Sequence, residues 1–579
     1  MCRQPSAHIR VMSKNKIAVY MLMLAVIVSG FGTFGSLPAY AATAGTAGNY
    51  FDVVRYGAVP NDSSDDYDAF HRALDEARGR DDIVTVHIPA GTYHLSKGLR
   101  IWSNTTIKAE PGARIICDMA SAGNMLYGVH RHNDGSACTG LSSQFSSCKN
   151  GGYTQEHDIT IDGGVWDRNC PTSVSAGLLT IIHSQNITIR NATFTGSTFH
   201  LLNLSGCANV NIANCTFTDM KKYTGSEKSF WGSTNRGNAA EVKRRYAQLE
   251  AVHLDYINAE GESGKYPQDG TPCSNVNISG CTFSNVGAGA GTHNKSGAAR
   301  GSGLHVSGCT FNNVWGHMAN FYSYDNSSLT NCSGTNTAAL CRIFDGHNDT
   351  VSGVSIDGKD GDIGPSIYVM DHSSGAVLNN ISINGRSIGG GVNSLIYIDG
   401  GSSVTASSVT LTNGNKGKAA VAVVNSSKLK MTKATIKSPK HAGVYAKKSS
   451  LTLLSSKITS PVKNGIYMEN CKSGTIKGNT VKSSKTCGIY VTSSKKVTIS
   501  NNTLSGNKDT GIYVYGSSKK KYSTASILKN TVKQGKSKYA IYLQGYCKSC
   551  KVKSNRVGGK GYAAKSKYKV KASGNKKIK

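Results

Sequence analysis

The chain has 579 residues and a formal net charge of +32, and its 16 cysteines are too sparse for a small scaffold held together by disulfides. A hydrophobic core must therefore stabilise the fold. The charge is divided unevenly: residues 1–400 hold 29 lysines and arginines against 32 acidic residues, whereas residues 401–579 hold 37 against 2. All of the excess positive charge thus lies in the C-terminal part of the chain.

The N-terminus has the layout of a secretory signal peptide. Basic residues up to Lys16 precede an apolar run over residues 17–34, and Ala39-Tyr40-Ala41 follows as a cleavage site of small residues. We therefore predict that residues 1–41 are a signal peptide and that the protein is secreted, either free or associated with the cell wall. No later stretch is apolar for long enough to span a bilayer, so the mature chain is expected to have no membrane span.

The segment after the predicted signal peptide indicates an amphipathic helix. Tyr67, Phe70, Leu74 and Ala77 recur at helical spacing, and Ser63-Ser64-Asp65 precedes them as a candidate N-terminal cap. We expect this helix to cover the open end of the first coil of a repeat structure.

Two sets of repeats predict that structure. Alternating apolar residues, a polar turn and a second short strand ending in phenylalanine recur in "NITIRNATF" (186–194), "NVNIANCTF" (209–217), "NVNISGCTF" (275–283) and "GLHVSGCTF" (303–311). Farther on, the third residues of "AGVYA", "NGIYM", "CGIYV", "TGIYV" and "YAIYL", which begin at residue 442, are 22, 23, 23 and 29 residues apart. Short strands at this period, with asparagine and glycine at the corners, predict an all-β parallel β-helix with the phenylalanines inside.

The first part of the mature chain also resembles a known superfamily. "FDVVRYGAVPNDSSDDYDAFHRALDEA" and "VTVHIPAGTYHLSKGLRIWSNTTIKAEPGARI" resemble the N-terminal segment of the pectate-lyase-like, right-handed parallel β-helix superfamily, and "HDITIDGGVWD" (157–167) resembles the next rungs of polygalacturonase-type glycosidases. The resemblance covers about residues 50–400. It implies a right-handed parallel β-helix that acts on a carbohydrate. From their composition, residues 401–579 are expected to follow as lysine-rich repeats.

One predicted strand, "EAVHLD" (250–255), contains two carboxylates and a histidine, unlike its neighbours. Val252 and Leu254 are its apolar alternates, so His253 and Asp255 should point outward, with Glu250 at the start of the strand. Long insertions lie on both sides of this strand, and long loops in repeat proteins commonly build a binding face.

Counting coils adds further residues to this groove. His293 follows one coil later once an insertion of roughly 15 residues is subtracted from the spacing. By similar counting, Tyr322 and His183 fall in neighbouring coils, and Asp269 lies on the loop that would overhang the site. We predict Asp255, Glu250, His293 and Asp269 as catalytic residues and His253, Tyr322 and His183 as substrate-binding residues.

These residue types suit the cleavage of a glycosidic bond. One carboxyl kept protonated can donate to the leaving oxygen, while an ionised carboxylate activates water or stabilises the transition state. Asp255 is the predicted principal acid or base, and no metal or other cofactor is expected. The sequence therefore predicts a glycosidase that acts on a polysaccharide.

Two alternatives remain open. Of the polygalacturonase site motifs, Asn-Thr-Asp, Asp-Asp, Gly-His-Gly and Arg-Ile-Lys, only Gly291-Thr292-His293 is a loose counterpart. A lyase would instead use His253, His293 or Tyr322 to abstract the proton next to a uronate carboxyl, with calcium as a possible cofactor. A non-enzymatic surface adhesin would bind glycan in the same groove without acid–base pairs.

The lysine-rich residues 401–579 have two interpretations. They either bind an anionic cell-wall polymer by charge or keep a long sheet soluble. Tyr445, Tyr467, Tyr490, Tyr513 and Tyr542 should form an outward ladder of stacked rings, with a sugar-binding platform as the alternative reading. Nucleic acid is not an expected partner, because basic charge is the sole feature that suggests it and the protein is predicted to be exported.

The cysteines divide into an interior set and candidate disulfides. Cys215, Cys281 and Cys309 each precede a repeat phenylalanine by two positions and should form an interior ladder. Cys138 with Cys148, and Cys332 with Cys341, are spaced to close loops. Cys547 and Cys550 are predicted to be a local disulfide or free thiols, because there is no second pair to complete a zinc site.

Overall fold

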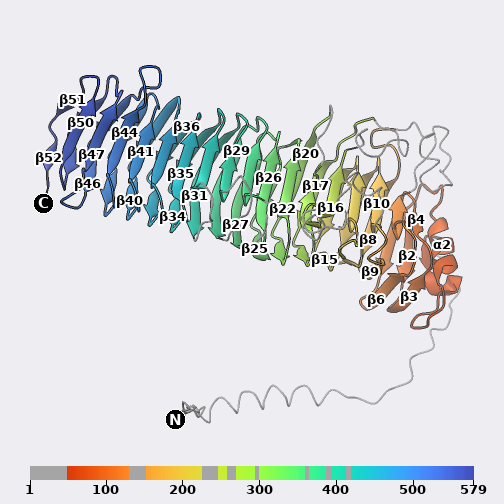
Figure 1. Ribbon diagram of the computed structural model, residues 1–579. Helices are drawn as coiled ribbons and strands as arrows, with labels where there is room; N and C mark the ends of the chain where they lie inside the picture. The colour runs from red at the N-terminus through yellow and green to blue at the C-terminus, as the bar shows by residue number, and fades with distance from the viewer. Residues whose placement is uncertain are drawn as a thin grey trace, which may run out of the picture. The chain divides into compact units, whose positions relative to one another are not determined.

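The computed structural model describes residues 48–128, 151–224, 246–256, 269–293, 299–358, 364–385, 394–412 and 419–578. The predicted signal peptide and the pair Cys138 and Cys148 lie outside the described residues. Asn49–Lys579 forms one compact unit. In it, short strands stack from coil to coil in parallel register (Figure 1). The all-β parallel β-helix predicted from the repeats is confirmed.

The coil has three faces. Face 1 is a single parallel sheet formed by β4 (Leu99–Ile101), β7 (Leu126–Gly128), β10 (Leu179–Ile182), β13 (Leu202–Ser205), β16 (Glu250–Asp255), β19 (Ala288–Gly291), β22 (His317–Tyr322), β26 (Ala339–Phe344), β28 (Ile367–Met370), β30 (Ile396–Ile398), β32 (Ala419–Val424), β35 (Ala442–Lys447), β38 (Ile466–Glu469), β41 (Ile489–Thr492), β44 (Ile512–Gly516), β47 (Ile541–Gly545) and β50 (Tyr562–Ser566).

Face 2 is formed by β1 (Tyr50–Asp52), β2 (Val84–Ile88), β5 (Thr105–Ala109), β8 (His157–Asp162), β11 (Gln185–Arg190), β14 (Ala208–Ala213), β17 (Ser274–Ser279), β20 (Gly301–Ser307), β23 (Tyr324–Asp325), β24 (Ser328–Thr330), β27 (Thr350–Gly358), β29 (Ala376–Asn384), β31 (Ser403–Thr412), β33 (Lys428–Thr432), β36 (Ser450–Leu454), β39 (Ser473–Lys477), β42 (Val497–Ser500), β45 (Ala525–Leu528), β48 (Lys551–Lys553) and β51 (Lys571–Ser573).

Face 3 is formed by β3 (Gly91–Leu95), β6 (Ala113–Cys117), β9 (Val165–Asp167), β12 (Thr193–Thr195), β15 (Thr216–Thr218), β18 (Thr282–Ser284), β21 (Thr310–Asn312), β25 (Ser333–Thr337), β34 (Thr435–Lys437), β37 (Lys457–Thr459), β40 (Thr480–Lys482), β43 (Thr503–Ser505), β46 (Thr531–Lys533), β49 (Arg556–Val557) and β52 (Lys576–Lys577). The long strands β27 and β31 pair with strands of both face 2 and face 3.

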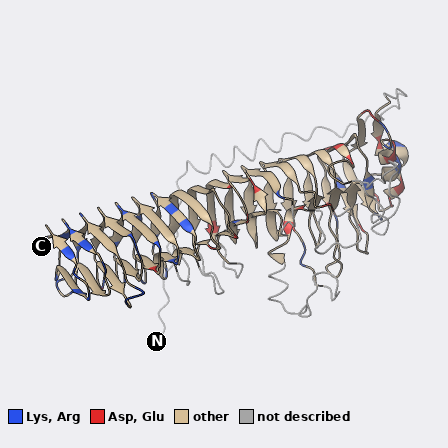
Figure 2. Ribbon diagram, turned by 90° about the horizontal axis from the view of Figure 1, so that it is seen from above, with Lys and Arg blue, Asp and Glu red and all other residues tan. Residues whose placement is uncertain are grey.

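The change in charge near residue 400 is not a break in the fold. β31 begins at Ser403 and pairs with β29 before it and with β33 after it. Lysine and arginine gather on the coils that follow (Figure 2). Exposed Lys437, Lys482 and Lys533 occupy the same position on face 3, separated by Thr459 and Ser505 of the intervening coils. The basic region therefore continues the same β-helix.

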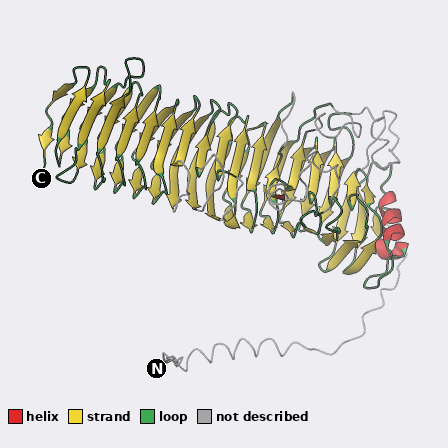
Figure 3. Cartoon of the chain, in the orientation of Figure 1, coloured by secondary structure: helices red, strands yellow, loops and turns green. Residues whose placement is uncertain are grey.

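The predicted amphipathic helix is α2 (Tyr67–Asp75), which follows the 3-10 turn η1 (Val53–Tyr56) and lies beside the first strands (Figure 3). The Phe70 ring packs 5.3 Å from the Tyr93 ring of β3. The predicted cap is correct in part: Asp66 is the N-cap residue, but the Asp65 carboxylate accepts the N–H of Tyr67 at 3.0 Å. Among the described residues, no helix is long and apolar enough to span a membrane.

The interior of the coil is a stack of identical positions. The rings of Phe194, Phe217, Phe283 and Phe311 are fully buried, and their centroids are 5.6, 4.9 and 4.7 Å apart in successive coils. Because strand residues alternate sides, the repeat phenylalanine returns to the same interior position at every coil. The predicted interior placement of these rings is confirmed.

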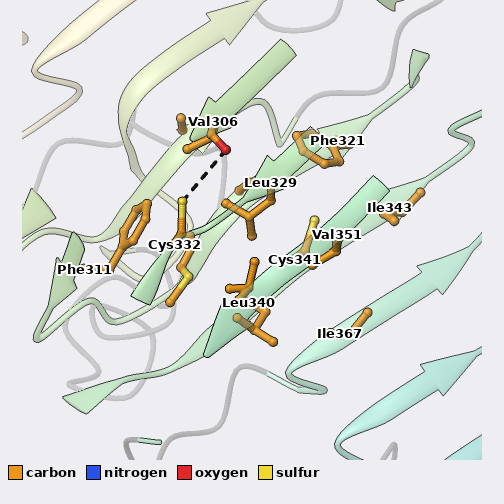
Figure 4. Close-up of a cluster of buried hydrophobic side chains, with 14 of the residues drawn as sticks. Val306, Phe311, Phe321, Leu329, Cys332, Leu340, Cys341, Ile343, Val351 and Ile367 are labelled. Atoms are coloured by element: carbon orange, nitrogen blue, oxygen red, sulfur yellow. Dashed lines mark hydrogen bonds between the residues drawn. The ribbon is translucent and has the colours of Figure 1, made fainter. Parts of the chain in front are cut away.

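A second interior ladder is formed by thiols. The backbone N–H groups of Cys215, Cys281 and Cys309 each donate to the sulfur of the cysteine one coil later, at 3.4 Å, which ends the series at Cys332. The disulfide suggested for Cys332 and Cys341 is therefore wrong: both are free and buried at separate interior positions (Figure 4). Cys547 and Cys550 are also buried free thiols, which was one of the two predicted states.

Asparagines at the corners of the repeats have a backbone role. Asn186, Asn209 and Asn275 adopt left-handed φ angles of 56°, 53° and 51°, a conformation that asparagine tolerates better than most residues. Their side chains also link the coils, since Asn275 donates to Asn209 at 2.9 Å and Asn209 donates to Asn186 at 3.2 Å. This explains why asparagine recurs in the repeat sequences.

Candidate active site

β16 spans the predicted strand at Glu250–Asp255, and all six of its residues are buried. Leu202 lies opposite Val252 and Ser205 opposite Asp255 in the coil before, whereas Ala290 and Gly291 lie opposite Val252 and His253 in the coil after. The small residues Ser205 and Gly291 are thus the neighbours of Asp255 and His253 in the adjacent coils.

The Glu250 carboxylate is the centre of the cluster. Its Oε2 atom lies 2.8 Å from Nδ1 of His293, which follows β19, and 3.4 Å from Nδ1 of His253. Its Oε1 atom accepts a hydrogen bond of 2.6 Å from the side-chain amide of Asn320 on β22. Glu250 has no exposed surface and is enclosed by these partners.

Three imidazole rings lie against one another above this carboxylate. The His253 ring is 4.0 Å from the His200 ring and 4.9 Å from the His293 ring, measured between centroids. Nδ1 of His200 donates to the backbone carbonyl of Glu250 at 2.6 Å. The second ring nitrogen of His253, Nε2, lies 3.3 Å from a carboxylate oxygen of Asp255.

Burial and charge set the protonation of the cluster. Burial alone would raise the pKa of Glu250, but His293 and His253 outweigh it, so this pKa lies well below its usual value. Burial alone would lower the pKa of His253, whereas Asp255 and Glu250 raise it to about 10. Burial and the neighbouring His253 hold the pKa of His200 well below its usual value. The expectation of a protonated carboxyl does not fit Glu250, because its histidine partners favour the ionised form.

Asp269 and His183 lie in a separate group of contacts. The Asp269 carboxylate accepts hydrogen bonds from Thr271 and from the backbone N–H of Gly152, and lies 3.8 Å from Nε2 of His183. Nδ1 of His183 lies 2.7 Å from the carbonyl oxygen of Gly152. These contacts hold the segment at Gly152 in place, and the predicted role of Asp269 beside Glu250 and His293 stays a prediction.

Tyr322 lies on β22, which pairs with β19, so it is in a neighbouring coil as counting predicted. It is the second residue after Asn320 on β22, so both side chains are on the outer side of face 1. Its ring is 5.2 Å from the ring of Phe344, which lies opposite it in the next coil.

Three residues of the site were missed by sequence reasoning: His200, Asn320 and Arg342. Their positions follow from the register, because Asn320 lies opposite Gly291 and Arg342 lies opposite Asn320. His200 precedes β13 by the same two positions by which Glu250 precedes Val252. Aligning each coil on its apolar alternates would have found all three.

The cluster includes a set of potential metal ligands. His200, Glu250, His253 and His293 each offer one ligand atom, and these four atoms lie within 4.8 Å of one another. Three imidazoles and a carboxylate are a donor set that suits a transition-metal ion.

The outer position of His253 continues along face 1 as one column, which we call the outer column. It runs through Asn203, His253, Gly291, Asn320, Arg342, Tyr368, Tyr397, Ala422, Tyr445, Tyr467, Tyr490, Tyr513 and Tyr542. Far from the cluster, the rings stack on one another, as Tyr467, Tyr490 and Tyr513 do at 5.0 Å with interplanar angles of 4° and 8°. Near the cluster, Tyr368 is instead perpendicular to Phe344, at 89°.

This difference separates two parts of the column. Stacked tyrosines cover each other's faces, so the predicted structural ladder is confirmed for residues 467–542. The rings beside Arg342 are turned edge to face and do not cover each other in this way.

Comparison with known proteins agrees with this architecture. Residues 50–241 match the family described as rhamnogalacturonase A/epimerase, pectate lyase-like, and residues 419–576 match the right handed beta helix region. The fold is thus a right-handed parallel β-helix of the pectate-lyase-like type.

Individual relatives cover parts of this architecture. Plasmin and fibronectin-binding protein A of Streptococcus pneumoniae (strain ATCC BAA-255 / R6) is 26% identical over 246 residues, which are 39% of this chain and 30% of that protein. The match therefore spans less than a third of the length of that relative. The crystal structure of PfbA, a surface adhesin of Streptococcus pneumoniae, has a TM-score of 0.44 at 17% identity and covers 78% of this chain and 92% of that one. The catalytic unit of the GH87 alpha-1,3-glucanase from Streptomyces thermodiastaticus strain HF3-3 has a TM-score of 0.29 at 13% identity, covering 85% and 70%.

Proposed function

We propose that the chain is a secreted enzyme that cleaves an acidic polysaccharide at the cluster on face 1. The observation that carries this proposal is the convergence of acid–base, amide and cationic side chains from successive coils on one outer surface. Asp255, His293 and Arg342 come from three different coils, and a polymer lying along the β-helix axis would meet them in turn. The rings next to Arg342 extend the same surface.

Arg342 supports an acidic sugar. Its Nε atom is buried without a hydrogen-bond partner, and among the described residues its guanidinium forms no ion pair, although it lies 5.3 Å from the ring of Phe344. Burial lowers the pKa of Arg342, which indicates a cation that is poorly solvated. A uronate carboxylate would provide the planar, bidentate partner that a guanidinium favours.

The site geometry favours elimination over the hydrolysis predicted from the sequence. Hydrolysis of a glycosidic bond uses two carboxyl groups that flank the bond. At this cluster Glu250 is fully buried, whereas 12% of the Asp255 side chain and 14% of the His293 side chain are exposed. Elimination requires one base and a cation beside the uronate carboxylate.

The proposed reaction is a β-elimination. Tyr322, as its phenolate, accepts the proton at C5 of the uronate, the electron pair forms the C4–C5 double bond, and the bond from C4 to the glycosidic oxygen breaks. The Tyr322 hydroxyl then returns that proton to the leaving oxygen. Arg342 stabilises the negative charge that develops on the carboxylate.

Adhesion is a second candidate function. The match to plasmin and fibronectin-binding protein A supports it, as does the lysine-rich region over residues 401–579. In this alternative the chain binds an anionic cell-wall polymer or a host component at the bacterial surface without cleaving it.

The test is incubation of the purified chain with neutral and uronate-containing polysaccharides, with reducing ends and the absorbance of unsaturated uronates both measured. We expect both to rise with uronate polymers. Arg342→Met should abolish most of the increase, whereas Arg190→Met, an exposed arginine on face 2, should not. Reducing ends without absorbance would identify a hydrolase, and neither change across the panel would leave adhesion as the function.

A further inference from the structure

We propose that His200, Glu250, His253 and His293 bind one divalent transition-metal ion. The four residues come from three successive coils: His200 precedes β13, Glu250 and His253 lie on β16, and His293 follows β19. Their ligand atoms lie within 4.8 Å of one another, so small side-chain rotations bring them around a common point. The inference rests on this geometry and holds whether or not the chain cleaves a polysaccharide.

The hydrogen bonds of His200 direct it toward this point. Its Nδ1–H donates to the carbonyl oxygen of Glu250 at 2.6 Å, which leaves the lone pair on Nε2. That Nε2 atom is buried and has no hydrogen-bond partner. A ring fixed through one nitrogen by a backbone carbonyl, with the other nitrogen free in the interior, is the usual arrangement of a metal-binding histidine.

His253 is arranged in the complementary way. Its Nε2 lies 3.3 Å from the Asp255 carboxylate, and its Nδ1 is buried without a hydrogen-bond partner and lies 3.4 Å from Oε2 of Glu250. A carboxylate on the far nitrogen orients the ring and increases the basicity of the nitrogen that binds metal. Asn320 orients Glu250 in a similar way, because its side-chain amide donates a hydrogen bond of 2.6 Å to Oε1 of Glu250.

A purely ionic cluster explains these contacts less completely. If Nδ1 of His253 carried a proton, it could donate a hydrogen bond to the Glu250 carboxylate. This would still leave Nε2 of His200 buried and without a hydrogen-bond partner, in a ring whose centroid is 4.0 Å from that of His253. A metal ion accounts for both buried nitrogens at once, since each becomes a ligand.

The donor set selects the kind of metal. Three imidazoles and one carboxylate suit zinc in tetrahedral coordination, whereas calcium takes six to eight oxygen ligands. This departs from the expectation of no metal, or of calcium for a lyase. Four protein ligands close a tetrahedral site, so the role we assign to zinc is structural. The ion would fasten the coils of β13, β16 and β19 at the place where long insertions interrupt the repeats.

The test measures metal binding without any substrate. The purified chain is stripped with a chelator, reloaded with zinc and passed through gel filtration, and the zinc content is measured by mass spectrometry. We expect one ion per chain, and reloading with cobalt should give the intense visible absorption of a tetrahedral site. His200→Asn and His253→Asn should weaken binding by about tenfold or more, and Asp255→Asn by about 10–100-fold through its support of His253. His305→Asn, on face 2 beside Ser328, is the matched control and should bind as the wild type does.

The wild type decides the outcome even if a variant fails to fold. A wild-type chain that retains no zinc and gives no tetrahedral cobalt spectrum overturns the inference, as do His200 and His253 variants that bind zinc as tightly as the wild type. Zinc binding without polysaccharide cleavage would contradict the proposed function alone. Cleavage by a chain that binds no zinc would contradict the metal site alone.

Discussion

Replacing Asp349 with asparagine tests whether one buried carboxyl makes the stability of the β-helix depend on pH. Asp349 lies just before β27 and has no exposed surface. One of its oxygens accepts the backbone N–H of Ser327 at 2.9 Å, whereas the other is buried without a hydrogen-bond partner. Burial, with a smaller contribution from the charge of Asp325, raises the pKa of Asp349 to about 8.

The sign of the effect follows from this direction. In the unfolded chain the carboxyl loses its proton near pH 4. In the folded chain it keeps that proton up to about pH 8. Stability from this group is therefore complete below pH 4 and is lost as the pH rises to 8. The two pKa values differ by about four, and each unit corresponds to about 1.36 kcal/mol, so the loss is at most about 5 kcal/mol.

The amide of Asp349→Asn imitates the neutral carboxyl at every pH. Thermal unfolding midpoints should therefore be similar for the variant and the wild type near pH 4, and the variant should become the more stable of the two between pH 5 and 8. Asp357→Asn, which changes an exposed carboxylate on β27, is the control and should show no such divergence. A difference between Asp349→Asn and the wild type that stays constant from pH 4 to 8 would refute the reasoning.

Three further predictions concern the core, the basic region and the site. Phe283→Ala removes a fully buried ring that stacks on rings at 4.9 and 4.7 Å and should lower the free energy of unfolding by about 3–5 kcal/mol, measured by denaturant titration; a loss below 1 kcal/mol would mean that the coil collapses around the hole. If residues 401–579 bind an anionic wall polymer, binding should fall steeply as salt approaches 1 M, where the Debye length is about 3 Å, and replacing Lys437, Lys482 and Lys533 with glutamine should reproduce part of that fall; binding that ignores salt would assign the lysines to solubility. Asp255→Asn should reduce turnover of a cleaved polysaccharide by about 10²–10⁴-fold if Asp255 is the acid or base, whereas recovery in excess zinc would show that it acts through His253.

The repeats were sufficient to predict the fold because every coil obeys the same alternation. The repeat phenylalanines, the cysteines two positions before them and the apolar alternates of 250–255 all return to the interior as predicted. This regularity also fixed both ends of β16 correctly. Each of these inferences depends on a local period, and local periods are present in the sequence.

The parts of the site that were missed depend on contacts between distant residues. His200 and Glu250 are 50 residues apart in sequence yet share a hydrogen bond, because an insertion separates adjacent coils. The contacts of Asp269 could not be predicted for a different reason. It lies on an irregular segment whose path no period specifies, and its carboxylate accepts hydrogen bonds from Thr271 and Gly152.

The later coils pair with one another in a constant register and at a constant spacing. From β35 to β47, each face 1 strand pairs with the next through the same positions, and each added coil lengthens the stack by one strand spacing of about 4.8 Å. A duplicated or deleted coil of 22 or 23 residues would leave every remaining ladder in register. The distance along the β-helix between the cluster on face 1 and the C-terminal end can therefore change by whole coils, during evolution or by design. The site itself does not change.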